Sequence, residues 1–318
     1  MMIADLPFLG VGLNYEPPMH DQYLAHHDEI DYLELPTDAF LLRMQWDDED
    51  GRTAWRDRAV EIAGAFPVVA HGIRMGLADA APYRTSYLDR LEPFLDLIDP
   101  VWFSDHLDQG SVSDGAQRTE LMHGIPIAFT AEQAQAVRRN MQTVTDRVRR
   151  PLLVENTWYD YMIKIPGAMD EPEFVRQVLD GTDHGLLLDL TNTWINAQNY
   201  GFDVDAWLAA APLDRVVELH VAGGELRTRG PKAGTWHDSH SRPVPEQVWA
   251  LVADVVAAAP VRAITLEWSN DVPPMPELLD HLSRARQLLH ASPFYQNKHV
   301  AAPEGISHVT PGNAVRHR

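Results

Sequence analysis

Leu152-Leu153-Val154-Glu155 is a run of three large apolar residues that ends in a carboxylate, and the same design recurs along this chain of 318 residues. Short, nearly continuous apolar runs are typical of parallel strands that are buried on both faces. Runs of this kind return at the interval of one strand plus one helix. Six of them end in a residue that can bind a metal, namely His71, His106, Glu155, Asp189, His220 and Glu267.

Eight runs rich in branched or aromatic residues can be counted, and most are followed by turn residues and a helical pattern. Eight buried parallel strands favour a closed barrel over an open sheet, so the chain is expected to form a single α/β domain of the (β/α)₈, or TIM barrel, type. The expected strands are Phe8–Leu13, Asp31–Leu35, Pro67–His71, Val101–His106, Pro151–Glu155, Gly185–Asp189, Arg215–His220 and Val261–Glu267.

Helix signals lie between these runs. Thr130 and Gln133 have the spacing of a capping box ahead of a helix over Ala131–Arg149. Further helices are expected after Asp170, over Pro245–Ala258 and over Met275–Leu289, whereas Tyr15–Asp28 predicts a short or irregular crossover.

Two connections are long, and each follows a strand that ends in histidine. They are Leu107–Phe129, after the fourth strand, and Ala222–Val244, after the seventh. Long loops at a barrel mouth are where substrate is usually held.

The periodic pattern stops near residue 296, where Pro, Gly, Asn and His become frequent. We therefore expect residues 1–295 to form a barrel domain that binds metal and carries catalysis, and residues 296–318 to be a disordered C-terminal tail. His299, His308 and His317 in this tail are expected to be solvated rather than to bind metal.

The amino-acid composition excludes several classes of partner and of metal site. The formal net charge of −20 disfavours a phosphate-tracking groove, so we expect no nucleic acid partner. With no cysteine in the chain, a metal must be held by imidazole, carboxylate, amide and water, which suits iron, manganese or zinc. The start Met1-Met2-Ile3-Ala4-Asp5 does not resemble a signal peptide, and no apolar run is long enough to span a membrane, so a cytoplasmic protein without a membrane partner is expected.

The C-terminal ends of all strands in a (β/α)₈ barrel open on one mouth, so the six terminal residues are expected to meet in one pocket. This arrangement predicts a metalloenzyme. Taken singly, each residue also has a structural explanation, since His71 and His220 can be core histidines and Glu155 can pair with an arginine. Asp238 and His240 in the loop after the seventh strand, and Asn192 after Asp189, are further candidate ligands.

Several motifs together resemble a known family, the multinuclear non-haem iron-dependent oxidative enzymes, which includes the iron subunit of methanobactin biosynthesis. The resemblance runs in order from Gly10-Val11-Gly12-Leu13 to the last helix. Its motifs are Ser104-Asp105-His106-Leu107, Leu152-Leu153-Val154-Glu155-Asn156, Leu187-Leu188-Asp189-Leu190-Thr191-Asn192, Glu218-Leu219-His220-Val221-Ala222-Gly223 and Leu266-Glu267-Trp268. One departure is Leu33-Glu34-Leu35-Pro36, where an Ala-Glu-Asn pattern is common in the family.

The resemblance implies a barrel that binds two or three iron ions and uses O₂ to modify a ribosomally made precursor peptide, usually with a partner protein that grips the leader. Glu155 and Glu267 would then be catalytic carboxylates able to bridge two ions, and Asp105 would orient a ligand. Arg74, Arg227 and Arg229 are available to hold a peptide carboxylate. The implied metal ligands are His71, His106, Glu155, Asp189, Asn192, His220, Asp238, His240 and Glu267.

Two other functions fit the same residues. A redox-neutral barrel, either a zinc or manganese hydrolase or a sugar isomerase, uses His, Asp and Glu at strand ends equally well, and the identity of the bound metal separates it from an iron enzyme. A metal-binding or peptide-delivery module without catalysis is the third possibility.

Overall fold

The computed structural model describes residues 3–80, 85–113 and 117–300. Within them, eight parallel strands form a closed barrel in the order β1-β12-β9-β8-β7-β4-β3-β2, which confirms the predicted TIM barrel. Every expected strand is present with its end shifted by two residues at most. The barrel strands are β1 (Gly10–Asn14), β2 (Tyr32–Pro36), β3 (Val68–Gly72), β4 (Phe103–His106), β7 (Leu152–Glu155), β8 (Gly185–Asp189), β9 (Val216–Ala222) and β12 (Ala263–Glu267).

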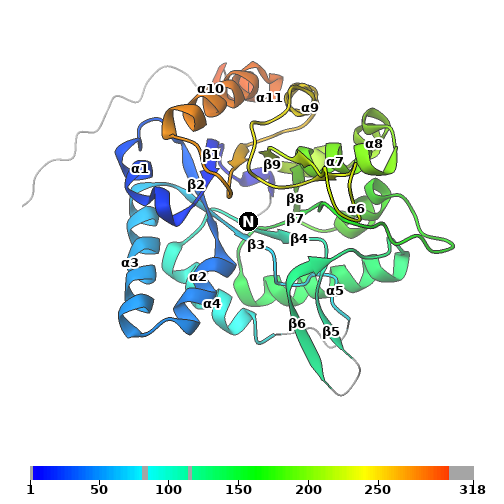
Figure 1. Cartoon of the computed structure of the whole chain (residues 1–318), viewed down its shortest axis with the longest axis horizontal. Coiled ribbons are helices and arrows are strands. Elements are labelled where there is room, and N and C mark those ends of the chain that lie inside the picture. The colour runs from blue at the N-terminus through cyan, green and yellow to red at the C-terminus, as the bar shows by residue number, and fades with distance from the viewer. Residues whose placement is uncertain (1–2, 81–84, 114–116, 301–318) are drawn as a thin grey trace, which may run out of the picture.

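The helices form an outer ring around the strands (Figure 1). They are α1 (His20–Ala25), α2 (Thr37–Trp46), α3 (Glu49–Ala65), α4 (Leu88–Ile98), α5 (Ala131–Val148), α6 (Glu171–Leu179), α7 (Leu190–Tyr200), α8 (Val204–Ala210), α9 (Glu246–Ala258), α10 (Met275–Ala291) and α11 (Pro293–Val300). The segment after β1, for which the sequence predicts a short or irregular crossover, contains a 3-10 turn (Pro17–Met19) and the short helix α1. In the described part of the chain, none of the helices has the length and apolar character needed to cross a membrane.

Half of the predicted capping box forms at the start of α5. The Thr130 hydroxyl accepts a hydrogen bond from the Gln133 backbone N–H at 3.1 Å. The Gln133 side chain does not reach back to complete the box, because its amide donates instead to the Ala78 carbonyl at 2.8 Å. This bond ties α5 to the segment that follows β3.

Each of the two long connections folds as a small hairpin. The loop after β4 carries β5 (Gln109–Ser113) and β6 (Arg118–Ile125), which pair antiparallel. The loop after β9 carries β10 (Glu225–Leu226) and β11 (Trp236–His237), also antiparallel. The β5–β6 hairpin projects beyond the barrel strands (Figure 1). Both hairpins follow strands whose C-terminal ends open on the mouth, where the sequence indicates long loops.

Helix α11 crosses the predicted boundary at residue 296 and continues to Val300. A hydrogen bond from the Gln296 N–H to the Ser292 carbonyl carries the helix across this boundary. The histidine at position 299 therefore belongs to a helix, while His308 and His317 lie outside the described residues.

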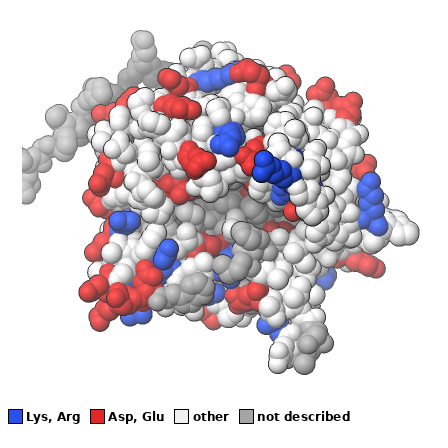
Figure 2. Space-filling view, viewed as in Figure 1, with Lys and Arg blue, Asp and Glu red and all other residues white. Residues whose placement is uncertain are grey.

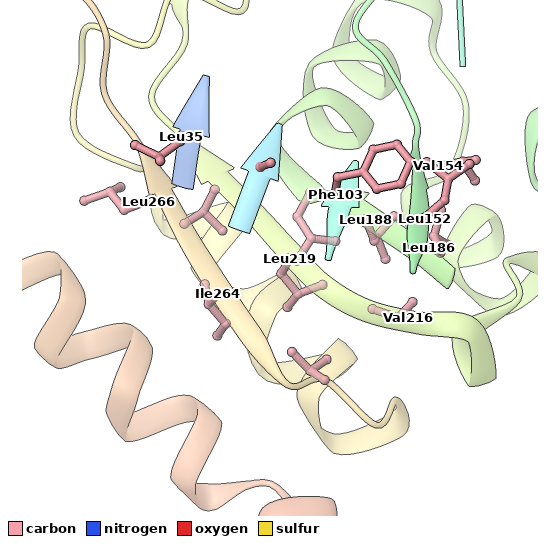
Figure 3. Packing of buried hydrophobic residues seen from close by; sticks show 14 of the residues in the cluster. Leu35, Phe103, Leu152, Val154, Leu186, Leu188, Val216, Leu219, Ile264 and Leu266 are labelled. Atoms are coloured by element: carbon pink, nitrogen blue, oxygen red, sulfur yellow. The ribbon is translucent and has the colours of Figure 1, made fainter. Parts of the chain in front are cut away.

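Alternation along the strands creates two different surfaces. Residues that point outward, such as Leu152, Leu188 and Ile264, are apolar and pack against the helices (Figure 3). Those that point inward are apolar only near the N-terminal ends of the strands. There a second cluster is formed by Leu6, Tyr32, Val69, Trp102, Leu153, Leu187, Val217 and Ala263.

The lower interior depends on a glycine and a buried carboxylate. A Cβ at Gly12 would lie 2.8 Å from the Tyr32 ring, so only glycine leaves room for that ring inside the barrel. The Glu218 carboxylate accepts hydrogen bonds from Trp102 Nε1 at 2.7 Å and Thr265 Oγ1 at 2.7 Å. Since a buried carboxylate is costly unless it is hydrogen-bonded, these donors stabilise a polar layer directly above the apolar one.

Gly223 directly follows β9 and leads into the mouth loop. We expect Gly223→Ala to be strongly destabilising. A Cβ there would lie 1.6 Å from the Arg242 carbonyl oxygen, a backbone atom that cannot swing away. Thermal unfolding should show a loss of several kcal/mol, about 3 or more, by analogy with other forced overlaps in packed sites.

Gly64→Ala in α3 is the matched control, because nothing lies within 4 Å of its added Cβ. Alanine in a helix is more stable than glycine by about 0.5–1 kcal/mol, so the melting temperature should stay the same or rise. Equal effects of the two substitutions would contradict the packing described around Gly223.

Candidate metal centre

One carboxylate, Glu155 at the end of β7, lies at the centre of the barrel mouth with 1% of its surface exposed. Its Oε2 is 3.0 Å from His106 Nε2 and 3.5 Å from His71 Nε2. Its Oε1 is 3.4 Å from His220 Nδ1. The ends of β3, β4 and β9 thus bring three of the predicted ligands together around Glu155 at the end of β7.

A second carboxylate, Glu267 at the end of β12, extends the cluster toward the loop after β9. Glu267 Oε2 is 3.1 Å from His220 Nδ1 and 3.8 Å from His240 Nε2. His240 Nε2 lies 2.8 Å from Asp238 Oδ2. The backbone of His240 has a φ of 48°, a left-handed conformation that is uncommon for this residue and turns the loop back over the mouth.

Asp189 and Asn192 form a third part of the cluster at the start of α7. Asp189 caps this helix, because its Oδ1 accepts from the Asn192 N–H at 2.7 Å. Asn192 Nδ2 donates to Asp189 Oδ2 at 2.9 Å, which leaves the amide oxygen of Asn192 for another partner. Asp189 offers one ligand atom that lies within 4.8 Å of atoms from Glu155 and His220.

Glu34 on β2 belongs to this centre, although it was not among the predicted ligands. Glu34 Oε2 is 2.8 Å from His220 Nε2, and it forms a possible ligand group with His71 and His220. Its signal in the sequence is a single acid within the apolar run Tyr32-Leu33-Glu34-Leu35. Since β2 ends two residues later, at Pro36, Glu34 lies below the strand end and does not follow the pattern of the other ligands.

The electrostatics of the cluster depend on burial and on mutual attraction. Burial lowers the pKa of His71 to about 4, so its imidazole is neutral, the form that binds metal. Burial opposes ionisation of Glu155, yet His106, His71 and His220 hold its pKa well below the ordinary value. In the same way His220 and His240 lower the pKa of Glu267 to about 2 against the effect of burial.

The remaining acids show the opposite shift. Burial, together with Asp238 and Glu155, raises the pKa of Asp189 well above its ordinary value. Burial also raises the pKa of Glu34 to about 8, despite the nearby His220. The pocket therefore holds more carboxylates than its own histidines neutralise, and a cation is what such a site favours.

The donors fit a metal ion. Among the described residues, Glu155 Oε2, His220 Nδ1, Asn192 Oδ1 and Asp238 Oδ1 are buried atoms without a hydrogen-bond partner. Buried polar atoms rarely stay unpaired unless an ion or water takes them. His71 Nδ1 is hydrogen-bonded to Ser104 Oγ at 2.9 Å, which leaves its Nε2 for the centre of the site, as second-layer partners of metal-binding histidines do.

Asp105, predicted to orient a ligand, lies on the other face of β4. Its neighbours Ser104 and His106 face the pocket, so Asp105 faces the helices. There its Oδ2 accepts from the Met75 N–H at 3.3 Å. Its Oδ1 accepts from the backbone N–H of His106 at 2.9 Å, so Asp105 braces the strand that carries this ligand, although its side chain does not face the pocket.

The three predicted substrate arginines also lie outside the cluster. Arg74 is buried and donates to the Leu121 carbonyl in β6 at 3.2 Å. Arg227 pairs with Asp160 at 2.6 Å and stacks over the Trp158 ring at 5.3 Å. Arg229 is exposed on the loop after β10. Arg74 and Arg227 thus hold mouth loops in place, and Arg229 is the most open of the three.

The site defined here is a closed TIM barrel with a buried cluster of histidines and carboxylates at its mouth that could hold metal. Comparison with known proteins identifies the family. The family model described as "RiPP precursor modification enzyme MbnB/TglH/ChrH" matches residues 10–290. The chain belongs to this family, which confirms the resemblance seen in its motifs.

Curated relatives cover nearly the whole chain. A UPF0276 protein from Caulobacter vibrioides is 34% identical over 281 residues, covering 88% of this chain and 94% of the relative. A UPF0276 protein from Rhizorhabdus wittichii is 32% identical over 283 residues, covering 88% and 95%.

Solved structures agree on the fold. A xylose isomerase domain containing protein from Salmonella typhimurium has a TM-score of 0.57 at 12% identity, over 90% of this chain and 98% of that one. A xylose isomerase-like TIM barrel protein from Mycobacterium smegmatis, solved in complex with magnesium, has a TM-score of 0.54 at 13% identity, over 92% and 99%.

We expect divalent metal to stabilise the fold, because it would neutralise the acids crowded in the mouth. A ligand present at about 100 times its dissociation constant adds about 2.7 kcal/mol to the free energy of unfolding. Melting curves of chelator-treated protein, recorded with and without added ferrous iron under nitrogen, should differ by several degrees. Identical curves would contradict a metal site in this pocket.

Glu155→Gln should lower the metal content several-fold while the barrel stays folded. The amide keeps the shape of the side chain but removes the charge that three histidines surround. The control is Glu225→Gln, since Glu225 is a half-exposed carboxylate that pairs with Arg242 at 3.1 Å beside the mouth. Elemental analysis and circular dichroism test both variants, and equal metal in wild type and Glu155→Gln would show that the site lies elsewhere.

Proposed function

We propose that this protein is an iron-dependent enzyme that uses O₂ to oxidise a RiPP precursor peptide. The observation that carries the proposal is the mixed set of donors around Glu155, within a family of RiPP precursor modification enzymes. Four histidines together with carboxylates and one amide suit iron better than magnesium, which prefers oxygen ligands alone.

The number of donors supports more than one ion. The cluster offers ten candidate side chains, whereas a single ion takes about six ligands. Glu155 has one oxygen toward His71 and His106 and the other toward His220, so it is placed to be shared. Glu267 stands in a similar position between His220 and His240. We therefore propose two or three iron ions, with these two carboxylates as the shared ligands.

The bound iron would supply the electrons and the open coordination position that oxidation by O₂ needs. The chain's own contribution is orientation. Glu34 is hydrogen-bonded to His220 Nε2 at 2.8 Å, which leaves Nδ1 for the side of Glu155 and Glu267. Ser104 fixes the His71 ring in the same manner.

The two hairpins at the mouth are where a peptide would approach. Arg74 secures the β6 hairpin, and Arg227 secures the β10–β11 hairpin against the segment after β7. Arg229 is the arginine that we propose to meet a peptide carboxylate. A separate leader-binding protein remains part of the proposal, on the basis of the resemblance alone.

The rival function is a redox-neutral hydrolase or sugar isomerase. The two xylose isomerase-like neighbours share the fold with this chain at 13% identity or less. Similarity at this level indicates a common fold and does not indicate a common function. Four histidines in the pocket also argue against a magnesium-dependent isomerase.

Protein purified from iron-supplied cells should contain more than one iron per chain by elemental analysis. Incubated with its precursor peptide and O₂, it should give a product with an oxidative mass change, and the same mixture under nitrogen should leave the peptide unchanged. Stoichiometric zinc with negligible iron, or equal turnover under nitrogen, would instead favour the redox-neutral enzyme.

A further inference from the structure

A groove of about 620 Å³ lies outside the metal cluster, on the side of the barrel where α6, α7 and α8 are grouped (Figure 1). Its walls come from the segment that follows β7, the first turn of α6 and the turn between α7 and α8. None of the ten cluster residues lines it. It is thus a separate surface feature that the proposed chemistry does not use.

The walls of the groove are mainly aromatic and apolar. Tyr159 and Tyr200 lie with ring centroids 5.3 Å apart, and Phe129 lies 6.5 Å from Tyr159. Phe202 and Trp207 complete the aromatic wall. Ile165, which also lines the groove, is 45% exposed, although large apolar side chains on a mouth loop are normally covered.

The floor of the groove holds a carboxylate without a cation. Glu171 is only 8% exposed, and among the described residues no Lys, Arg or His forms an ion pair with it. Burial raises the pKa of Glu171 to about 8, and the Trp207 indole lowers it only in part. A carboxylate in such surroundings is costly unless a cation or donor joins it.

The other charged residues that line the groove are also mainly acidic. Asp170, Glu173 and Asp203 line the groove, and Lys164 is the single basic residue among its lining. Acidic side chains also surround much of the mouth face as a whole, with fewer basic ones between them (Figure 2). Charge complementarity therefore favours a positively charged occupant.

A simpler explanation is that Glu171 stabilises the N-terminus of α6, where acids are favourable. Any such effect is outweighed by burial, which raises the pKa of its carboxyl. Asp170, the residue at the capping position, makes no side-chain cap hydrogen bond either. Helix capping thus does not account for a carboxylate at this depth.

We propose that this groove binds an arginine or lysine side chain of the peptide substrate, with Glu171 as the counter-ion and the aromatic residues around the cation. Aromatic faces and a carboxylate are the usual means of recognising an ammonium or guanidinium group. The identity of the occupant as substrate rests on the proposed function above.

The groove borders the segments that follow β4 and β7. A smaller cavity shares Phe129, Tyr159, Met162 and Ile163 with it and is also lined by Leu107 and Thr157. Leu107 follows His106, and Thr157 is two residues from Glu155. The groove thus lies beside the two strands whose ends carry His106 and Glu155.

The test uses the peptide acetyl-Leu-Arg-Leu-amide and its neutral counterpart with citrulline in place of arginine, because the two differ in charge and hardly in shape. Calorimetric titration of the wild-type protein should show the arginine peptide binding at least about tenfold more tightly, the ratio expected for one charge-assisted hydrogen bond. Glu171→Gln should remove this preference.

Glu173→Gln is the matched control. Glu173 lies two residues further on in α6 and lines the same groove, but it is half-exposed and has Arg176 at 4.0 Å and Gln177 at 3.0 Å as partners. This variant should keep the preference for arginine. Equal binding of the two peptides by the wild type, no binding at millimolar concentration, or a preference that survives Glu171→Gln would each overturn the proposal.

The iron content of Glu171→Gln should equal that of the wild type, because Glu171 is not part of the metal cluster. If the wild-type protein contains iron but does not prefer the arginine peptide, the proposed role of the groove is refuted and the proposed function is unaffected. If the wild-type protein prefers the arginine peptide but contains no iron, the role of the groove is supported and the proposed oxidase function is refuted.

Discussion

The structure depends on one constraint, which is that Glu155 is a nearly fully buried carboxylate and must be compensated from every side. His71, His106 and His220 lie around it, each from a different strand. Only a closed barrel brings strand ends that are far apart in the chain to within contact of one side chain. The fold therefore assembles the candidate metal site, since Glu155 meets its three histidines only where these strand ends converge.

The alternation of the strands allows this arrangement without weakening the core. Outward residues such as Leu188 and Ile264 supply the packing against the helices, so the inward positions near the mouth are free to be polar. Below them, Tyr32 and Trp102 close the interior as an apolar layer. Glu218 separates the two layers and is stabilised by its own donors, so it is a structural acid although it lies two residues from His220 in the same strand.

The loops at the mouth differ in what they do: two are hairpins fastened to the barrel, and the segment after β7 borders the groove. Arg74 and Arg227 are used to fasten hairpins to the barrel, which makes the entrance to the metal cluster a defined surface. The segment after β7 instead borders a groove whose buried acid, Glu171, forms no ion pair with a Lys, Arg or His of the described residues. The separation matters because a peptide can be gripped at one place while its reacting residue lies at another, and each place can be altered without the other.

The sequence by itself determined the barrel, its eight strands and most of the residues that gather at the mouth. Each strand is a local pattern, and the rule that strand ends converge turns local positions such as His71 and Glu267 into one site. Tertiary structure alone decided the rest. Glu34 is brought into the site by contact with His220, 186 residues away along the chain. Asp105 is turned outward by the strict alternation of β4, which its place beside His106 does not reveal. Long side chains such as Arg74 and Arg227 take whichever distant partner packing supplies, and the depth of Glu171 arises only where α6, α7 and α8 meet. Pairings over such separations leave no local pattern, because they depend on how the elements pack and not on the order of residues within any one of them.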